Sequence, residues 1–253
     1  MTDNDQEKMP ITSHLDELRK RLVRSLIAIG IGMGICYNFK EKLLEIITAP
    51  LADVLPKNSY MIYTGLTEAF FNYLKISFVA GLILASPIVL YQVWKFISPG
   101  LYQSEKKYVA PFVIVASVLF AAGVCFCYFL VLPPAFKFFT EFSTDFLKPM
   151  LTLKEYLSLS LKLLIVFGLM FEIPVVLFFL AKMGVITPAQ LAKKRKYAVL
   201  IFFIAAAILT PTPDAFTQIM MAIPMIVLYE VGIIVIRLSI RPKKDAEQQP
   251  AEE

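Results

Sequence analysis

Six long apolar segments run through this chain, and few folds can accommodate them. Each is apolar on all sides instead of at alternate residues, which favours helices over the strands of a membrane barrel. The segments lie at about 22–39, 70–96, 108–132, 156–182, 197–210 and 216–236. A helix needs about 20 residues to cross a hydrocarbon core of about 30 Å, and four segments meet or nearly meet that length. We therefore predict an all-α integral membrane protein with six transmembrane helices.

The overall composition supports the same class. Of the 253 residues, 58% are hydrophobic and 18% are charged, whereas a soluble domain has about 45–50% apolar and about 25% charged residues. The N-terminal residues show no cleavable signal peptide, and we detect no internal repeat. We predict one polytopic membrane domain over residues 1–240, followed by a polar, disordered cytoplasmic tail at 241–253.

The distribution of lysine and arginine predicts the orientation. With the N-terminus inside, 17 of the 25 Lys and Arg residues fall on the inner side, including every Arg. Because cytoplasmic loops carry the excess of Lys and Arg, both termini are predicted to be cytoplasmic. The outer connection after the first segment contains EKLLEIITAPL, whose spaced leucines and isoleucines predict a short helix on the outer surface.

Length and proline content predict an irregular bundle. The fifth segment has 14 residues and spans only about 21 Å as a helix, so it either thins the membrane or lies behind its neighbours. Pro87, Pro174 and Pro224 lie inside apolar runs, and Pro133–Pro134 is predicted to end the third segment. Since an interior proline removes a backbone hydrogen bond and bends the helix, these residues predict a curved bundle.

Glu172 is the most anomalous residue, because it lies near the middle of the fourth segment. A charged side chain at that depth costs roughly 2.5–3.5 kcal/mol on insertion scales. No cation lies nearby on the same segment, since Lys162 is ten residues away. Two interpretations stay open: a neutral, hydrogen-bonded structural acid, or a polar contact for a ligand, a proton or a partner helix.

Other polar residues lie at the connections between segments. Asp214 and Gln218 are at the outer mouth of the short hairpin, where Asp214 suits a helix N-cap but Gln218 is left unexplained. On the inner side, Glu105 precedes Lys106 and Lys107. Glu105 is either a solvated loop charge or part of an interface.

The stretch SHLDELRKRL precedes the first apolar segment. Ser13 is predicted to cap the helix, with Asp16 three residues later in a position close to that of a capping box. Asp16–Lys20 and Glu17–Arg21 are spaced as i, i+4 pairs, each worth about 0.2–0.5 kcal/mol. Local helix chemistry thus accounts for Asp16 but only weakly for Glu17.

Signatures of enzyme chemistry are absent from the sequence. His14 is the only histidine, so no histidine-based metal cluster or catalytic triad can form. Nucleotide-binding fingerprints are missing, and the three cysteines lie in apolar runs without a CxxC pair. We expect no enzymatic activity, no cofactor, no metal and no nucleic-acid partner.

Five stretches together resemble the TatC family, the core subunit and signal-peptide receptor of the twin-arginine protein translocase. They are SHLDELRKRL, APL, ASPIVLYQVWKFISPGLYQSEKK, FGLMFEIP and LTPTPDAFTQ, in the family's order and with similar spacing over residues 11–237. The resemblance implies a glove-shaped fold of six helices. The chain departs from familiar family forms at Lys106–Lys107, which stand where some members have two arginines, and at Thr212 between two prolines.

The resemblance also implies roles for single residues. Glu17 and Glu105 would contact the twin arginines of a signal peptide, and Arg19, Leu101 and Phe96 would complete that binding site. Glu172, Gln218 and Asp214 would form polar or partner contacts within the membrane. The remaining implied roles are structural and belong to Pro50, Pro87 and Pro174.

The implied partners are TatA- and TatB-like single-helix subunits, twin-arginine signal peptides of folded cargo, the lipid bilayer and further copies of the chain in a receptor complex. The implied location is the bacterial cytoplasmic (inner) membrane, with export driven by the proton motive force. An ion-coupled small-solute carrier that uses Glu172 and Asp214 is the alternative function, and a purely structural scaffold is a third. The carrier hypothesis predicts an internal repeat and more intramembrane polar groups than the sequence contains.

Overall fold

The computed structural model describes residues 11–52, 61–97, 109–141, 152–209 and 215–239. Within these ranges the chain is helical apart from turns and one isolated bridge between Ile62 and Thr152. The elements are α1 (Ile11–Tyr37), α2 (Lys40–Ala52), α3 (Glu68–Ile97), α4 (Val109–Phe126), the π-helix η3 (Cys127–Val131), α5 (Leu132–Thr140), α6 (Leu153–Met170), α7 (Ile173–Lys182), α8 (Pro188–Lys193), α9 (Arg195–Leu209) and α10 (Ala215–Ser239).

The predicted class, an all-α membrane protein, is confirmed. In the described ranges, four stretches are long and apolar enough to cross a membrane: Glu68–Ile97, Ala110–Thr140, Leu153–Lys182 and Ala215–Ser239. The pair α1–α2, which is bent by 87°, is a fifth candidate when its two helices are counted together as one span. The short fifth segment corresponds to α9, which has 15 residues and a length of about 22 Å.

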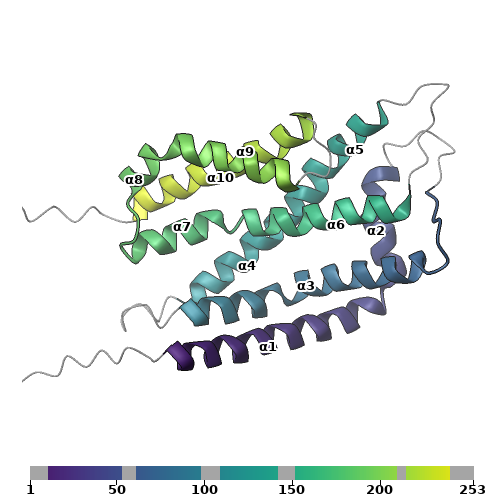
Figure 1. The fold of residues 1–253 in the computed structure, drawn as a ribbon, viewed down its shortest axis with the longest axis horizontal. Helices are drawn as coiled ribbons and strands as arrows, with labels where there is room; N and C mark the ends of the chain where they lie inside the picture. The colour runs from purple at the N-terminus through teal and green to yellow at the C-terminus, as the bar shows by residue number, and fades with distance from the viewer. Residues whose placement is uncertain (1–10, 53–60, 98–108, 142–151, 210–214, 240–253) are drawn as a thin grey trace, which may run out of the picture.

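Most of the helix ends gather at two opposite ends of the bundle. One end holds the N-termini of α1, α4 and α9 and the C-termini of α3, α7 and α10, while α2 and α5 lie toward the opposite end (Figure 1). Described cations of the first end include Arg19, Lys95, Lys182, Arg195 and Arg237. Both described ends of the chain therefore lie on the same, cation-rich side.

Helices α1 and α3 lie side by side and antiparallel (Figure 1). Their backbones approach closely at Gly32 and Gly81, where a Cβ added to Gly32 would lie 2.6 Å from the Gly81 carbonyl oxygen. Only a residue without a Cβ permits two helix backbones to approach so closely. These two glycines therefore set the distance between α1 and α3.

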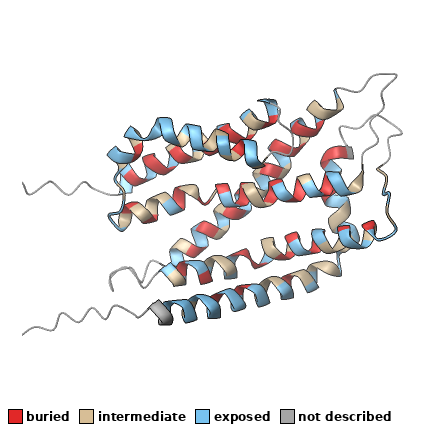
Figure 2. Ribbon diagram, viewed as in Figure 1, coloured by how far each residue is buried: buried red, intermediate tan, exposed pale blue. Residues whose placement is uncertain are grey.

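The core lies around α6. Leu157 and Phe167 of α6, Leu132 of α5 and Met221 of α10 are among its fully buried residues. Figure 2 shows buried residues on α6 and on the inward faces of α3 and α10, whereas α1 is largely exposed outside its contact with α3. Exposed apolar side chains on the outside are expected of helices that face lipid.

Other groups replace the hydrogen bonds that two prolines remove. Pro50 lies inside α2 and cannot donate to the Ile46 carbonyl one turn earlier; instead the Tyr128 hydroxyl donates to it at 2.7 Å. Pro87 leaves the Ile83 carbonyl without its backbone donor, and the Ser86 hydroxyl donates to it at 2.8 Å. Both helices consequently continue through their prolines.

Three expectations about helix boundaries are wrong. Pro133–Pro134 does not end the third helix, because both prolines occupy the first turn of α5, where a backbone N–H is not needed. The fourth segment, 156–182, is not one helix but α6 and α7, separated at Phe171–Glu172. Ser13 is not an N-cap, since α1 already begins at Ile11.

Candidate functional site

The first part of the site is the carboxylate of Glu17 near the start of α1. The Arg21 side chain donates to Glu17 Oε1 through Nε at 3.1 Å and also through Nη2. The side chains of Glu17 and Arg21 are 25% and 11% exposed. Of the two predicted i, i+4 pairs, the one between Glu17 and Arg21 is therefore confirmed. The Glu17 side chain is still partly exposed, while Asp16 and Arg19 on the same helix are exposed.

The second part is Phe96, near the end of α3. Its ring stacks on His14 of α1, with centroids 4.4 Å apart and planes inclined at 22°. The structure thus brings Phe96 to the same end of the bundle as Glu17 and Arg19. The sequence did not predict the role of His14, because its pairing depends on how α1 and α3 align.

Three of the expected site residues, Glu105, Leu101 and Asp214, lie outside the described residues, as does the predicted tail at 241–253. Gln218 is described, and its amide donates to the Phe203 carbonyl of α9 at 3.0 Å. The N-cap interpretation of Asp214 left the role of Gln218 unexplained. This hydrogen bond gives Gln218 a structural role, because it ties α10 to α9 one turn inside their connection.

Glu172 lies at the break between α6 and α7. Its residue is 8% exposed, and its Oε1 atom is buried without a hydrogen-bond partner. Pro174 in the first turn of α7 has no N–H to continue the hydrogen-bonding pattern of α6, which explains why the helix breaks here. Among the described residues, Oε1 therefore lacks the hydrogen bond that the interpretation of Glu172 as a neutral, hydrogen-bonded acid expects.

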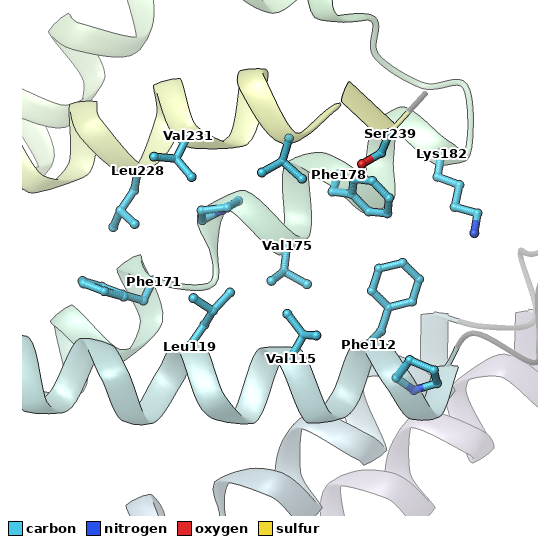
Figure 3. A pocket seen from close by; sticks show the side chains of 13 residues that line it. Phe112, Val115, Leu119, Phe171, Val175, Phe178, Lys182, Leu228, Val231 and Ser239 are labelled. Atoms are coloured by element: carbon cyan, nitrogen blue, oxygen red, sulfur yellow. The ribbon is translucent and has the colours of Figure 1, made fainter. Parts of the chain in front are cut away.

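An apolar cavity of about 550 Å³ borders this break. Figure 3 shows Phe112 and Leu119 of α4 on one side, Val231 of α10 on the opposite side and Phe171 toward one end. Lys182 extends beside Phe178 at the other end (Figure 3). The sequence did not indicate this cavity, because its lining comes from three helices that are distant along the chain.

The described residues contain no group of three or more His, Cys, Asp or Glu side chains that could hold a metal ion. Their cysteines are unpaired: Cys36 is half-buried, Cys125 is exposed and Cys127 is buried. The described residues instead offer two acidic side chains for binding: Glu17, partly exposed among cations, and Glu172, buried beside an apolar cavity.

Replacing Glu172 with methionine is expected to raise the melting temperature of the detergent-solubilised protein by about 3–8 °C. A buried acceptor without a partner costs about 1–3 kcal/mol, and 1 kcal/mol corresponds to about 2–4 °C at this chain length. Glu155→Met, at an exposed position on α6, is the matched control and should shift the melting temperature by less than about 2 °C. A marked loss of stability in Glu172→Met would show instead that Glu172 holds α6 and α7 together.

The family model of Sec-independent protein translocase protein (TatC) matches residues 13–224 of this chain. Among solved structures, a crystal structure of the twin-arginine translocase receptor TatC superposes with a TM-score of 0.80 and 44% sequence identity. That match covers 88% of this chain and 98% of the solved one.

Curated relatives extend over nearly the whole chain. The TatC protein of Desulforapulum autotrophicum is 51% identical over 249 residues, which cover 98% of this chain and 92% of the relative. The TatC protein of Escherichia coli K12 is 37% identical, with coverages of 96% and 94%. The chain therefore belongs to the TatC family of Sec-independent protein translocase subunits, which are multi-pass membrane proteins of protein transport and not enzymes.

Proposed function

We propose that this chain is the receptor subunit that binds twin-arginine signal peptides of folded cargo and organises single-helix TatA- and TatB-like partners for export. It resides in the bacterial cytoplasmic membrane as one domain over residues 1–240, with six transmembrane helices and both termini in the cytoplasm. Several copies assemble in the receptor complex, and the proton motive force drives export. A related solved structure is described as a twin-arginine translocase receptor, which supports this proposal.

The observation that carries the proposal is the partly exposed acidic side chain of Glu17 at the cation-rich end. A guanidinium group binds a carboxylate through two parallel N–H···O bonds, which gives both strength and orientation. Arg21 already places its guanidinium against Glu17, although both of its donors, Nε and Nη2, go to the single oxygen Oε1. Glu105 would supply the second acid for the second arginine of the signal peptide.

The surrounding charges favour selective binding. Arg19, Lys20 and Arg24 are exposed on the same helix as Glu17. They repel a cationic peptide everywhere except at an acid, so isolated carboxylates become the specific points of attachment. Phe96, stacked on His14, adds an aromatic surface beside them for apolar residues of the signal peptide.

The single-helix partner subunits pack along α9 and α10. Helix α9 is short, and Ile201, Ile204 and Ile208 on it are exposed apolar residues that a single-helix subunit can cover. Because a helix of about 22 Å is shorter than a hydrocarbon core of about 30 Å, the membrane thins beside it. Such a thinned region, close to the polar side chain of Gln218, is a favourable place for partner assembly.

The proposal predicts that a twin-arginine signal peptide binds the receptor complex, purified with its partners, about tenfold more tightly than the same peptide with twin lysines. Both peptides carry the same charge, but only arginine presents a planar fork to a carboxylate. Fluorescence anisotropy with labelled peptides measures the two affinities. Equal affinities would contradict recognition through guanidinium geometry and would leave only general charge attraction.

A further inference from the structure

Two buried polar atoms without partners face the same interface. The Nη1 atom of Arg21 on α1 is a buried donor, and the Oε1 atom of Gln92 on α3 is a buried acceptor; neither has a hydrogen-bond partner. Both residues are 9% exposed. An unpaired buried donor or acceptor is costly, so a complementary pair of them on adjacent helices is informative.

The helix register places these two residues opposite each other. Arg21 lies eleven residues before Gly32, and Gln92 lies eleven residues after Gly81. Since α1 and α3 are antiparallel and touch at Gly32 and Gly81, both side chains are at the same level, about 16 Å from that contact. Eleven residues are close to three full helical turns, so both side chains also project from the face that carries the glycines.

At the same end of the two helices, His14 and Phe96 are in ring contact. This contact shows that α1 and α3 remain adjacent beyond the level of Arg21 and Gln92. The Gln92 carbonyl oxygen is therefore the alternative acceptor that the same interface offers to the Arg21 guanidinium.

Arg21 is also the group that occupies Glu17. Its Nε and Nη2 atoms both donate to the same oxygen, Glu17 Oε1. A ligand guanidinium that binds Glu17 bidentately needs both carboxylate oxygens, so it competes with Arg21 at Oε1. Once displaced, Arg21 would remain a largely buried cation without its carboxylate, which is strongly unfavourable unless another acceptor receives it.

We propose that Arg21 is an internal guanidinium that holds the Glu17 carboxylate in the unoccupied receptor, and that Gln92 accepts Arg21 when a ligand guanidinium replaces it. The exchange leaves no acceptor without a donor, because the Glu17 carboxylate receives the ligand guanidinium and the previously unpaired Gln92 oxygen receives Arg21. Arg21 and Gln92 are thus positioning residues for the peptide site. This inference rests on the proposed function and names the regulation of that same site.

A double-mutant cycle on twin-arginine peptide binding tests the exchange in the purified receptor complex. Gln92→Leu should weaken binding about tenfold in the native background, because displaced Arg21 then has no acceptor. In the Arg21→Gln background the same substitution should change the affinity less than about twofold, because no cation has to be rehoused. A merely structural role of Gln92 would weaken binding equally in both backgrounds, and that result would overturn the proposal.

Asn72→Leu is the matched control, since Asn72 is a buried amide at the opposite end of the same helix, α3. It should leave the peptide affinity unchanged.

Gln92→Glu provides a second test, which also serves if Gln92→Leu reduces the yield of folded protein. A carboxylate at this position should draw Arg21 away from Glu17 and tighten peptide binding at least twofold. Unchanged or weaker binding in Gln92→Glu would contradict the exchange.

The failure of this inference is distinguishable from the failure of the proposed function. If the native complex binds twin-arginine and twin-lysine peptides equally, the receptor proposal itself fails. If the native complex discriminates between them but Gln92→Leu has the same effect with and without Arg21, only the exchange fails.

Discussion

Gly32→Ala is expected to lower the melting temperature of the detergent-solubilised protein by about 5–10 °C, whereas Gly30→Ala is expected to raise it by about 2–4 °C. A Cβ at position 32 would lie 2.6 Å from the Gly81 carbonyl oxygen, whereas a Cβ at position 30 would have no atom within 4 Å. The obstructing atoms belong to the backbone of α3, so no side chain can move aside. Overpacking of this kind typically costs about 1–3 kcal/mol, occasionally more.

The comparison is well controlled, because both substitutions are on α1 and change helix propensity equally. Alanine is a better helix former than glycine, so propensity alone would stabilise both variants. A Gly32→Ala protein as stable as Gly30→Ala would mean that α1 and α3 do not pack at this crossing. The same experiment also checks the register on which the Arg21–Gln92 inference depends.

Glu17→Ala is expected to weaken the binding of a twin-arginine signal peptide about a hundredfold and thereby to reduce export of a folded twin-arginine reporter. Removing one partner of a hydrogen-bonded charge pair at an interface costs about 2–5 kcal/mol. Because Glu17 is 25% exposed, we expect the lower part of that range, about 3 kcal/mol, which corresponds to about a hundredfold in affinity. Quantifying the reporter in the periplasmic fraction measures the effect.

Asp16→Ala is the control for this prediction, since Asp16 is the neighbouring acid, is exposed and lies on the same helix. Its export should stay within about twofold of the native level, because surface pairs contribute little. Membrane levels of both variants must be equal by immunoblot. Normal export and normal peptide crosslinking in Glu17→Ala would contradict the assignment of Glu17 as an arginine contact.

Much of the architecture could be predicted because it follows from local chemistry. Continuous apolar runs predict membrane helices regardless of tertiary context, and the Glu17–Arg21 pair needs only a helix and a spacing of four residues. The boundary errors have local causes too. Pro133–Pro134 could start a helix as well as end one, and the sequence alone did not distinguish between the two.

The candidate site was predicted only in part. Its acids could be found because a carboxylate is conspicuous in a basic or apolar stretch. His14 against Phe96, Tyr128 on the carbonyl that Pro50 leaves free, and the cavity beside Glu172 could not be found in this way. Each joins residues from different helices, so each depends on the relative placement of those helices.

The sequence by itself determined the class of environment, the position of most helices and the uneven distribution of cations, because these follow from hydropathy, periodicity and charge along one chain. The tertiary structure decided which side chains meet. The contact between Gly32 and Gly81 sets the separation and register of α1 and α3, and that register places Arg21 opposite Gln92. Hydropathy specifies that an apolar face is covered, but only the close fit of two helix backbones specifies which residues cover it.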